Sequence, residues 1–185
     1  MIRIEQGAIV LRSAEMKDAP LLNAWWNDGA VMAHAGFPLG LGQSMEETEE
    51  AIRSYAGKLS QLCIIEIDGQ PVGEMSFGIG GHEAVPGWKI CNPAFQNQGY
   101  GRRIIRMTWD YLFQDEALNA AMPIGRLVWD TNLSNTRAQH VYEILGARRV
   151  GVRENCWENQ LGQMQSAVDY ELTRAMYEEL MRKDN

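Results

Sequence analysis

A strand-like segment, a turn that holds two glycines and an amphipathic helix follow one another between residues 87 and 113. The segment 87–91 is typical of a strand, and Asn92-Pro93 ends it. After the turn, residues suited to a buried face recur at helical spacing. They are Ile104, Ile105, Thr108, Trp109 and Leu112. The unit predicts a helix over 99–113 that packs one face against a sheet.

The start of this helix suits an anion. Gly99 and Gly101 fall where first-turn N–H groups have no acceptor within the helix and the helix dipole adds partial positive charge. Without side chains there, a phosphate can approach the backbone closely. The dinucleotide fingerprint needs a small residue where Ile104 stands, and no Gly-Lys-Ser/Thr follows as in a P-loop. We therefore expect a phosphate ligand other than NAD or ATP, with a plain tight turn as the alternative.

Two motifs in this order resemble the GNAT N-acetyltransferase superfamily. Residues 96–102 contain the form Gln-x-x-Gly-x-Gly of its acyl-CoA pyrophosphate loop, and residues 135–147 contain its Asn-x-x-Ala-x-x-x-Tyr-x-x-x-Gly pattern. The opening of the chain, with Trp26-Asn27-Asp28, resembles the branch of ribosomal-protein and aminoglycoside 6′-type acetyltransferases. The Asp-x-x-x-Ser-Asn spacing from Asp130 also resembles the aminoglycoside 6′-type enzymes. Ala147 departs from the Phe usual after the Leu-Gly pair.

The other elements are predicted from similar patterns. Strands are expected near 7–12, 62–67, 72–77, 87–91, 126–131, 148–157 and 164–173. Helices are expected over 18–27, after Ser44, over 135–145 and at the end of the chain. Asp68-Gly69 is a hairpin signal, Ser44 and Glu47 form a capping box, and 78–83 is expected to be a loop.

Strands and helices mixed in this order predict an α+β fold. At 185 residues, with no Pro- or Ser-rich linker, the chain is expected to form a single domain over 1–185. The GNAT resemblance implies a central mixed β-sheet of about seven strands flanked by helices. It also implies a splay between the fourth and fifth strands, where acyl-CoA enters.

Composition narrows the class of partner. The net charge is −7 and no basic stripe follows the sequence, so nucleic acid is not expected as a partner, whereas cationic substrates are favoured. No apolar run of about 18 residues and no leader is found, so we expect a cytoplasmic enzyme without a membrane span. The three cysteines are expected to be reduced thiols, and the three histidines lack metal-ligand spacing, so no metal is predicted.

The resemblance implies acetyl-CoA as co-substrate. The residues expected to bind it are Lys89, Ile90, Cys91, Gln96, Asn97, Gln98, Gly99, Tyr100, Gly101, Arg102, Asn135 and Tyr142. Asn135 lies about two turns before Tyr142 on one helix face, so the two can contact one ligand. A homodimer is compatible with the resemblance.

Acetyl transfer to an amine needs a neutral nucleophile, a stabilised oxyanion and a proton for the leaving thiolate. Tyr142 matches the superfamily's general acid. Asp130, at the end of an apolar strand, is the first choice for the carboxylate that binds and deprotonates the amine; Glu74 or an ordered water is the alternative. Core, capping and surface roles stay open for these residues.

The predicted function is transfer of an acetyl group from acetyl-CoA to a primary amine by direct attack, without a covalent enzyme intermediate. The alternative is a non-catalytic acyl-CoA-binding or sensing module. Acceptor contacts are assigned to Trp25, Trp26, His34, Phe37 and Asp130, although core packing explains the tryptophans equally well. The acceptor is a small-molecule amine or a protein N-terminus, and ribosomal-protein N-termini, aminoglycosides, polyamines and amino acids all stay open.

Overall fold

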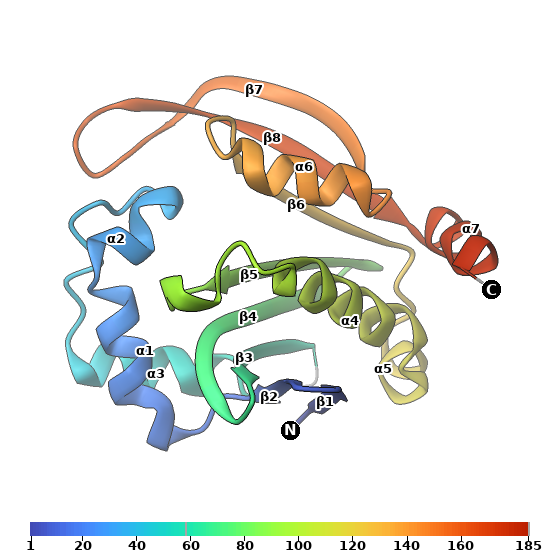
Figure 1. Ribbon diagram of the computed structural model, residues 1–185, viewed down its shortest axis with the longest axis horizontal. Coiled ribbons are helices and arrows are strands. Elements are labelled where there is room, and N and C mark those ends of the chain that lie inside the picture. The colour runs from blue at the N-terminus through green and yellow to red at the C-terminus, as the bar shows by residue number, and fades with distance from the viewer. Residues whose placement is uncertain (58, 185) are drawn as a thin grey trace.

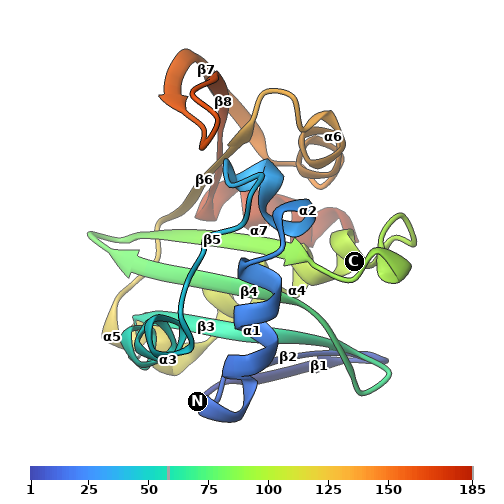
Figure 2. The same cartoon turned by 90° about the vertical axis from the view of Figure 1, so that its left-hand side faces the viewer.

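A computed structural model describes residues 1–57 and 59–184, which form one eight-stranded sheet with helices on both faces (Figure 1, Figure 2). The strands are β1 (Arg3–Gln6), β2 (Ile9–Ser13), β3 (Ser60–Ile67), β4 (Gln70–Gly80), β5 (Glu83–Ile90), β6 (Arg126–Asn132), β7 (Arg148–Glu158) and β8 (Met164–Thr173). The α-helices are α1 (Ala19–Trp26), α2 (Gly29–Met32), α3 (Met45–Ser54), α4 (Tyr100–Gln114), α5 (Glu116–Ala121), α6 (Thr136–Ile144) and α7 (Arg174–Asp184). The α+β class is confirmed.

The sheet has the order β1-β2-β3-β4-β5-β6-β8-β7. Strands β1 to β5 form an antiparallel meander, and β6, β8 and β7 form a second antiparallel group. A parallel pairing of β5 with β6 joins the two groups. Figure 1 shows the second group turned away from β5. The mixed sheet that the resemblance implied is therefore present.

Two tight turns set the register of the central strands. Asp68 and Gly69 have φ values of 51° and 75°, as a type I′ turn requires, and the predicted hairpin β3–β4 is confirmed. The loop predicted over 78–83 is wrong. Strand β4 continues to Gly80, and Gly81 and His82 form a second turn with φ values of 55° and 69°. The glycines that indicated a loop lie at the end of a long strand and in its turn.

The beginning of the chain adds the strand that the prediction of about seven missed. The strand expected near 7–12 corresponds to β2, and a turn at Gly7, whose φ is 59°, joins it to the unpredicted strand β1 in a hairpin. The short helices α2 and α5 were also not predicted. The capping box of α3 is confirmed, because Ser44 Oγ accepts from the Glu47 N–H and Glu47 Oε2 accepts from the Ser44 N–H.

Apolar clusters lie on opposite faces of the sheet. On β3, Cys63, Ile65 and Ile67 belong to the larger cluster with α4, whereas Leu62 and Ile64 belong to the smaller cluster with α1 and α3. Figure 2 shows α1 and α3 together on one face. Burial on both faces explains why β3 is an almost continuous apolar run rather than an alternating one.

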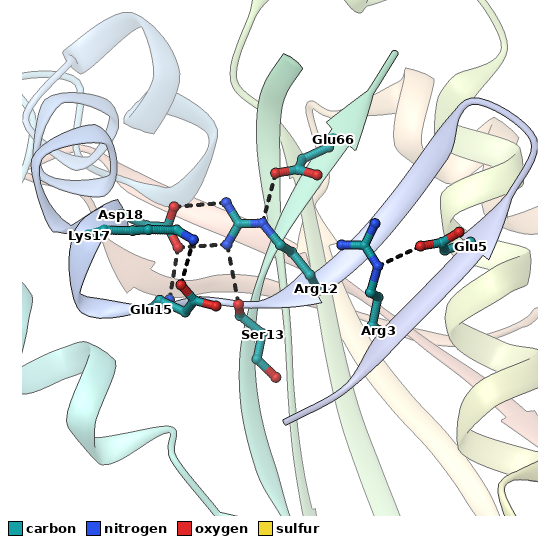
Figure 3. Close-up of polar contacts among 8 residues, drawn as sticks. All are labelled: Arg3, Glu5, Arg12, Ser13, Glu15, Lys17, Asp18 and Glu66. Atoms are coloured by element: carbon teal, nitrogen blue, oxygen red, sulfur yellow. Dashed lines mark hydrogen bonds and ion pairs between the residues drawn. The ribbon is translucent and has the colours of Figure 1, made fainter. Parts of the chain in front are cut away.

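A buried ion network fixes the start of α1 to the sheet (Figure 3). Arg12 of β2 donates from both terminal nitrogens to Asp18, at 2.7 and 2.8 Å, and from Nε to Glu66 at 2.7 Å. All three side chains are at most 17% exposed. Burial alone would raise the pKa of Asp18, but the Arg12 guanidinium holds it below the usual range. The bidentate contact thus orders the helix that covers the second face of the sheet.

Replacing Arg12 with methionine is expected to lower the free energy of unfolding by about 2 kcal/mol at neutral pH. The change leaves two carboxylates without their cation, and the residual exposure keeps the loss below that of a fully buried pair. Chemical denaturation measures it. The difference from the wild type should shrink as pH falls through the depressed pKa of Asp18, since the contribution of that carboxylate exists only while it is charged. A difference that does not change with pH would contradict this account.

Candidate active site

Strands β5 and β6 separate after a very short ladder. Only Glu83↔Arg126 and Ala84↔Leu127 pair within the described residues. The next residue of β5 that faces β6 is Pro86, which has no N–H to donate. The splay that was expected between the fourth and fifth predicted strands therefore lies between β5 and β6, and the sequence places a ladder-breaking residue at its origin.

The backbone of β5 beyond Pro86 is directed at this opening. The Cys91 N–H donates to the Val72 carbonyl of β4. The backbone N–H groups of the alternate residues Trp88 and Ile90 therefore point away from β4, toward the opening. Gln96 Nε2 donates to the Ile90 carbonyl at 2.8 Å, which ties the turn before α4 to the end of the strand. Backbone N–H groups on this side of β5 can polarise a carbonyl that lies in the opening.

A cleft of about 950 Å³ occupies the opening and reaches both faces of the sheet. The predicted site residues that line it are His34, Lys89, Ile90, Cys91, Gln96, Asn97, Gly99, Gly101, Arg102, Asp130, Asn135 and Tyr142. Among the described residues, six other predicted site residues do not line it. They are Trp25, Trp26, Phe37, Glu74, Gln98 and Tyr100. Two segments distant in sequence, around the two motifs, thus meet at one cleft.

The N-terminus of α4 fits a diphosphate. Gly99 occupies the cap position with φ 81°, and no side chain caps this helix, whereas Asn135 caps α6. Apart from the chain neighbours and the backbone of the helix itself, no described atom lies within 4 Å of a Cβ placed at Gly99 or Gly101. The first-turn N–H groups are therefore left for an anion, and the space that the missing side chains leave is open to it.

Positive charge surrounds the same end of the cleft. Arg102 and Arg137 both line it, and Arg137 Nη1 donates to Asn97 Oδ1 at 3.0 Å, so α6 contacts the turn before α4. Sequence analysis missed Arg137 even though it stands inside the second motif. Its signal was a basic residue two positions after Asn135, which becomes meaningful only when α6 is known to lie beside α4.

Tyr142 contributes a largely buried phenol to the lining of the cleft. Tyr142 is 8% exposed, and its ring centroid lies 5.4 Å from the ring centroid of Trp129 and 5.2 Å from that of Tyr170. No hydrogen bond from any described residue occupies its hydroxyl. Burial, with a smaller effect of the Asp130 charge, raises the pKa of Tyr142 to about 12. The phenol is therefore protonated at neutral pH and is free to donate.

Asp130 lies on the opposite face of β6 from the aromatic cluster. Its side chain is 55% exposed, and Arg153 Nη2 donates to it at 2.5 Å. The same guanidinium also bonds Asp169 at 2.7 Å. One cation shared by two carboxylates leaves an excess negative charge at this wall, which suits a cationic ligand.

Glu74 is held by neighbours rather than by the cleft. Trp26 Nε1 donates to Oε2 at 2.7 Å, and Lys89 Nζ donates to Oε1 at 2.9 Å. The Glu74 side chain is 13% exposed. Lys89, which donates to this carboxylate, lines the cleft, whereas Glu74 does not. Trp26, 8% exposed, is a core residue of the cluster formed by α1 and α3.

Aromatic residues of the cleft were also missed. Trp88, Trp129 and Trp157 line it. The first two lie in segments predicted as strands, where an alternating pattern does not say which face meets the opening. Trp157 reaches the cleft only because the β7–β8 hairpin bends over it, which no local pattern records.

Comparison with protein families decides the assignment. The profile of the Acetyltransferase (GNAT) domain matches residues 8–148. The chain belongs to the GNAT acetyltransferase family. It is accordingly an acetyl-CoA-dependent N-acetyltransferase, and acetyl-CoA is its co-substrate. A comparison with proteins of curated function finds no match.

Solved structures share the fold. A GNAT-family acetyltransferase from Bacillus anthracis is 24% identical, with a TM-score of 0.74 over 93% of this chain and 98% of that one. RimL, a ribosomal L7/L12 α-N-protein acetyltransferase in complex with coenzyme A, is 17% identical, with a TM-score of 0.80 over 93% of this chain and 98% of that one. Spermidine N-acetyltransferase from Vibrio cholerae, in complex with CoA and spermine, is 18% identical, with a TM-score of 0.78 over 93% of this chain and 99% of that one.

Two further properties bear on the class of site. None of the helices that the structure describes is both long and apolar enough to cross a membrane. Over residues 1–57 and 59–184, no group of three or more His, Cys, Asp or Glu side chains is placed to hold a metal ion.

Proposed function

We propose that this acetyltransferase transfers the acetyl group to a primary amine by direct attack, with Asp130 and Tyr142 as its proton-transfer residues. The observation that carries the proposal is that the protonated phenol of Tyr142 on α6, whose hydroxyl no described residue engages, lines the same cleft as the carboxylate of Asp130 on β6. A module that only bound acyl-CoA would need neither group. The acceptor is a small-molecule amine or a protein N-terminus, which are also the kinds of acceptor named for the spermidine and RimL enzymes.

The cofactor end of the cleft has a defined role for each part. The N–H groups at the start of α4, together with Arg102 and Arg137, hold the diphosphate of acetyl-CoA. Asn135 and the β5 backbone contact its pantetheine arm, and the thioester supplies the acetyl group. Asn135 also caps α6, so its side-chain oxygen accepts from the Ala138 N–H. Its Nδ2 donates one proton to Thr131 Oγ1 at 3.2 Å, and the second Nδ2 proton makes the contact with the arm.

The reaction needs two proton transfers, one at Asp130 and one at Tyr142. Asp130 binds the ammonium of the acceptor and removes its proton, directly or through water. The amine nitrogen then forms a bond to the carbonyl carbon while backbone N–H groups of β5 stabilise the oxyanion. The carbon–sulfur bond breaks, and Tyr142 donates its proton to the thiolate, so no covalent bond to the enzyme is formed.

The function is tested by measuring CoA release from purified protein against a panel of primary amines. We expect release with at least one of four classes: an unbranched polyamine, an aminoglycoside, an amino acid and a ribosomal-protein N-terminal peptide. Acetyl-CoA should raise the melting temperature, because a ligand at 100 times its Kd stabilises the native state by about 2.7 kcal/mol. Stabilisation by acetyl-CoA without CoA release on any amine would favour the binding-module alternative. If acetyl-CoA neither stabilised the protein nor released CoA with any amine, the proposed function would be wrong.

The Asp130→Asn variant is expected to have a kcat/KM for the acceptor about 10- to 100-fold lower than the wild type, mainly through a higher KM for the amine. Asparagine keeps the shape of the aspartate side chain but removes its negative charge and its ability to act as a base. The KM for acetyl-CoA should not change. Asp169→Asn is the matched control, since Asp169 shares Arg153 but does not line the cleft. Equal effects of the two changes would mean that Asp130 acts through Arg153 alone, and Glu74 or an ordered water would become the candidate base.

A further inference from the structure

The turn between β7 and β8 is fastened to the segment that follows α2. The Gln160 N–H donates to the Gly36 carbonyl at 3.0 Å, and Gln160 Nε2 donates to the Gly40 carbonyl at 2.8 Å. In the other direction, the Leu39 N–H donates to Gln160 Oε1 at 2.9 Å. One residue thus joins segments 121 positions apart, and Figure 1 shows the β7–β8 turn reaching toward α2. We call these three bonds the Gln160 clasp.

The turn that carries Gln160 is itself ordered. Asn159 Oδ1 accepts from the backbone N–H groups of Leu161 and Gln163, and its N–H donates to the Gln163 carbonyl. Leu161 is 54% exposed and has no part in the clasp. The clasp is therefore a contact between two preformed segments, and its strength resides in Gln160.

Trp157 lies just before this turn and packs on Gly36. A Cβ placed on Gly36 would come within 2.3 Å of the indole ring, and φ at Gly36 is 95°. No other residue type fits there without moving the ring. The half-buried indole lines the cleft together with His34 and Ala35. The clasp and the glycine together hold the ring at this edge of the cleft.

The indole and Asp130 belong to one face of the second strand group. Trp157 pairs with Gln165 and Asp130 pairs with Asp169, and residues 165 and 169 of β8 share a face because their separation is even. Both residues line the cleft. An aromatic face and a carboxylate in one cleft are the two groups that contact a protonated amine on a hydrocarbon chain.

We propose that Trp157, held by the Gln160 clasp, is a specificity-determining residue for the acceptor and selects amines on unbranched chains. The inference rests on the proposed function, because it takes this wall of the cleft as the acceptor side. The clasp closes the edge between the hairpin and segment 33–40, so an acceptor enters beside the indole and cannot lie across it. A chain with an ammonium end passes along the ring to Asp130, whereas a branched ring system meets the indole.

The test compares an unbranched polyamine with an aminoglycoside as acceptors of four variants. Trp157→Ala should raise the KM for the polyamine about tenfold and increase relative activity on the aminoglycoside, with the KM for acetyl-CoA unchanged. Trp157→Phe should keep most of the wild-type preference. Gln160→Ala should shift the preference in the same direction as Trp157→Ala, and Leu161→Ala, on the same turn, should not.

Two measurements do not depend on turnover. Hydrogen exchange at the Leu39 amide should become faster in Gln160→Ala and not in Leu161→Ala, and calorimetric polyamine affinity should fall about tenfold in Trp157→Ala. A wild type that binds the polyamine but releases no CoA with any amine would overturn the proposed function and leave these readouts to decide the inference. Three results would overturn the inference about Trp157. They are an unchanged acceptor preference and polyamine affinity in Trp157→Ala, unchanged exchange of the Leu39 amide in Gln160→Ala, and no polyamine binding by the wild type.

Discussion

Turnover of the Tyr142→Phe variant is expected to fall about 100-fold, the typical contribution of a general acid, while acetyl-CoA affinity stays at the wild-type level. The ring and its packing against Trp129 and Tyr170 are kept, and only the proton donor is lost. Steady-state kinetics on a verified acceptor and calorimetric titration with acetyl-CoA measure the two quantities. Because the hydroxyl has no bond within the described residues, the melting temperature should not change.

Tyr170→Phe is the control within the same aromatic cluster. The Tyr170 hydroxyl donates to Glu143 at 2.9 Å, and the residue does not line the cleft. This variant should lose about 1 kcal/mol of stability and keep its turnover, which is the opposite pattern. If Tyr142→Phe instead loses stability and keeps its rate, Tyr142 is a core tyrosine and the acid lies elsewhere.

The raised pKa of Tyr142 gives the acid a pH signature. A phenol with a pKa of about 12 stays protonated beyond pH 10.0, its ordinary value. Deprotonation of Tyr142 should therefore not lower the wild-type rate at any pH up to 10.0. A rate that fell with an apparent pKa well below 10.0 would point to another group as the donor.

The Gly101→Val variant is expected to bind acetyl-CoA at least about 100-fold more weakly. A valine side chain fills the space that the diphosphate needs and blocks two or more N–H contacts to an anion, each of which is worth about 1.5 kcal/mol or more. Folding should be spared. Apart from the chain neighbours and the backbone of α4 itself, no described atom lies within 4 Å of the new Cβ. No positive φ opposes the side chain, and valine is a better helix former than glycine. Calorimetric affinity and the melting temperature of the free protein are the measurements.

Gly151→Val provides the matched control. Gly151 likewise has no described atom other than its chain neighbours within 4 Å of an added Cβ, but it lies on β7 and does not line the cleft. Its acetyl-CoA affinity should equal that of the wild type. Parallel losses of affinity and stability in Gly101→Val would identify the glycine as a structural residue. Gly99 is less suitable for this test, since its φ of 81° would strain any side chain.

Local chemistry explains what the sequence could predict. The α4 unit, the α3 capping box and the Asp68-Gly69 turn depend on residues within a few positions of one another, and all three have the expected structure. The two motifs also led to residues that line a single cleft. Neither motif required knowledge of the strand order, because each lies within one strand–turn–helix or helix segment.

Distant contacts explain what the sequence could not predict. Whether a strand residue such as Glu74 faces an opening depends on its neighbours, and here Lys89 and Trp26 take both carboxylate oxygens. Arg153 reaches Asp130 from another strand, and Trp157 reaches the cleft through a hairpin that is held 121 positions away. The tryptophans of α1 had a core alternative from the start, and Trp26 occupies the core.

The strand order also constrains when the two halves of the protein can form during synthesis. Strands β1 to β5 pair in the order in which the ribosome delivers them, and each partner is the strand just made. Strand β6 has two pairs with β5 but seven with β8, which is the last strand of the described chain. The wall that carries Asp130 and Trp129 therefore has no full partner until β8 emerges. Until then, the completed β1–β5 half presents an open β5 edge, which only two residue pairs of β6 can cover.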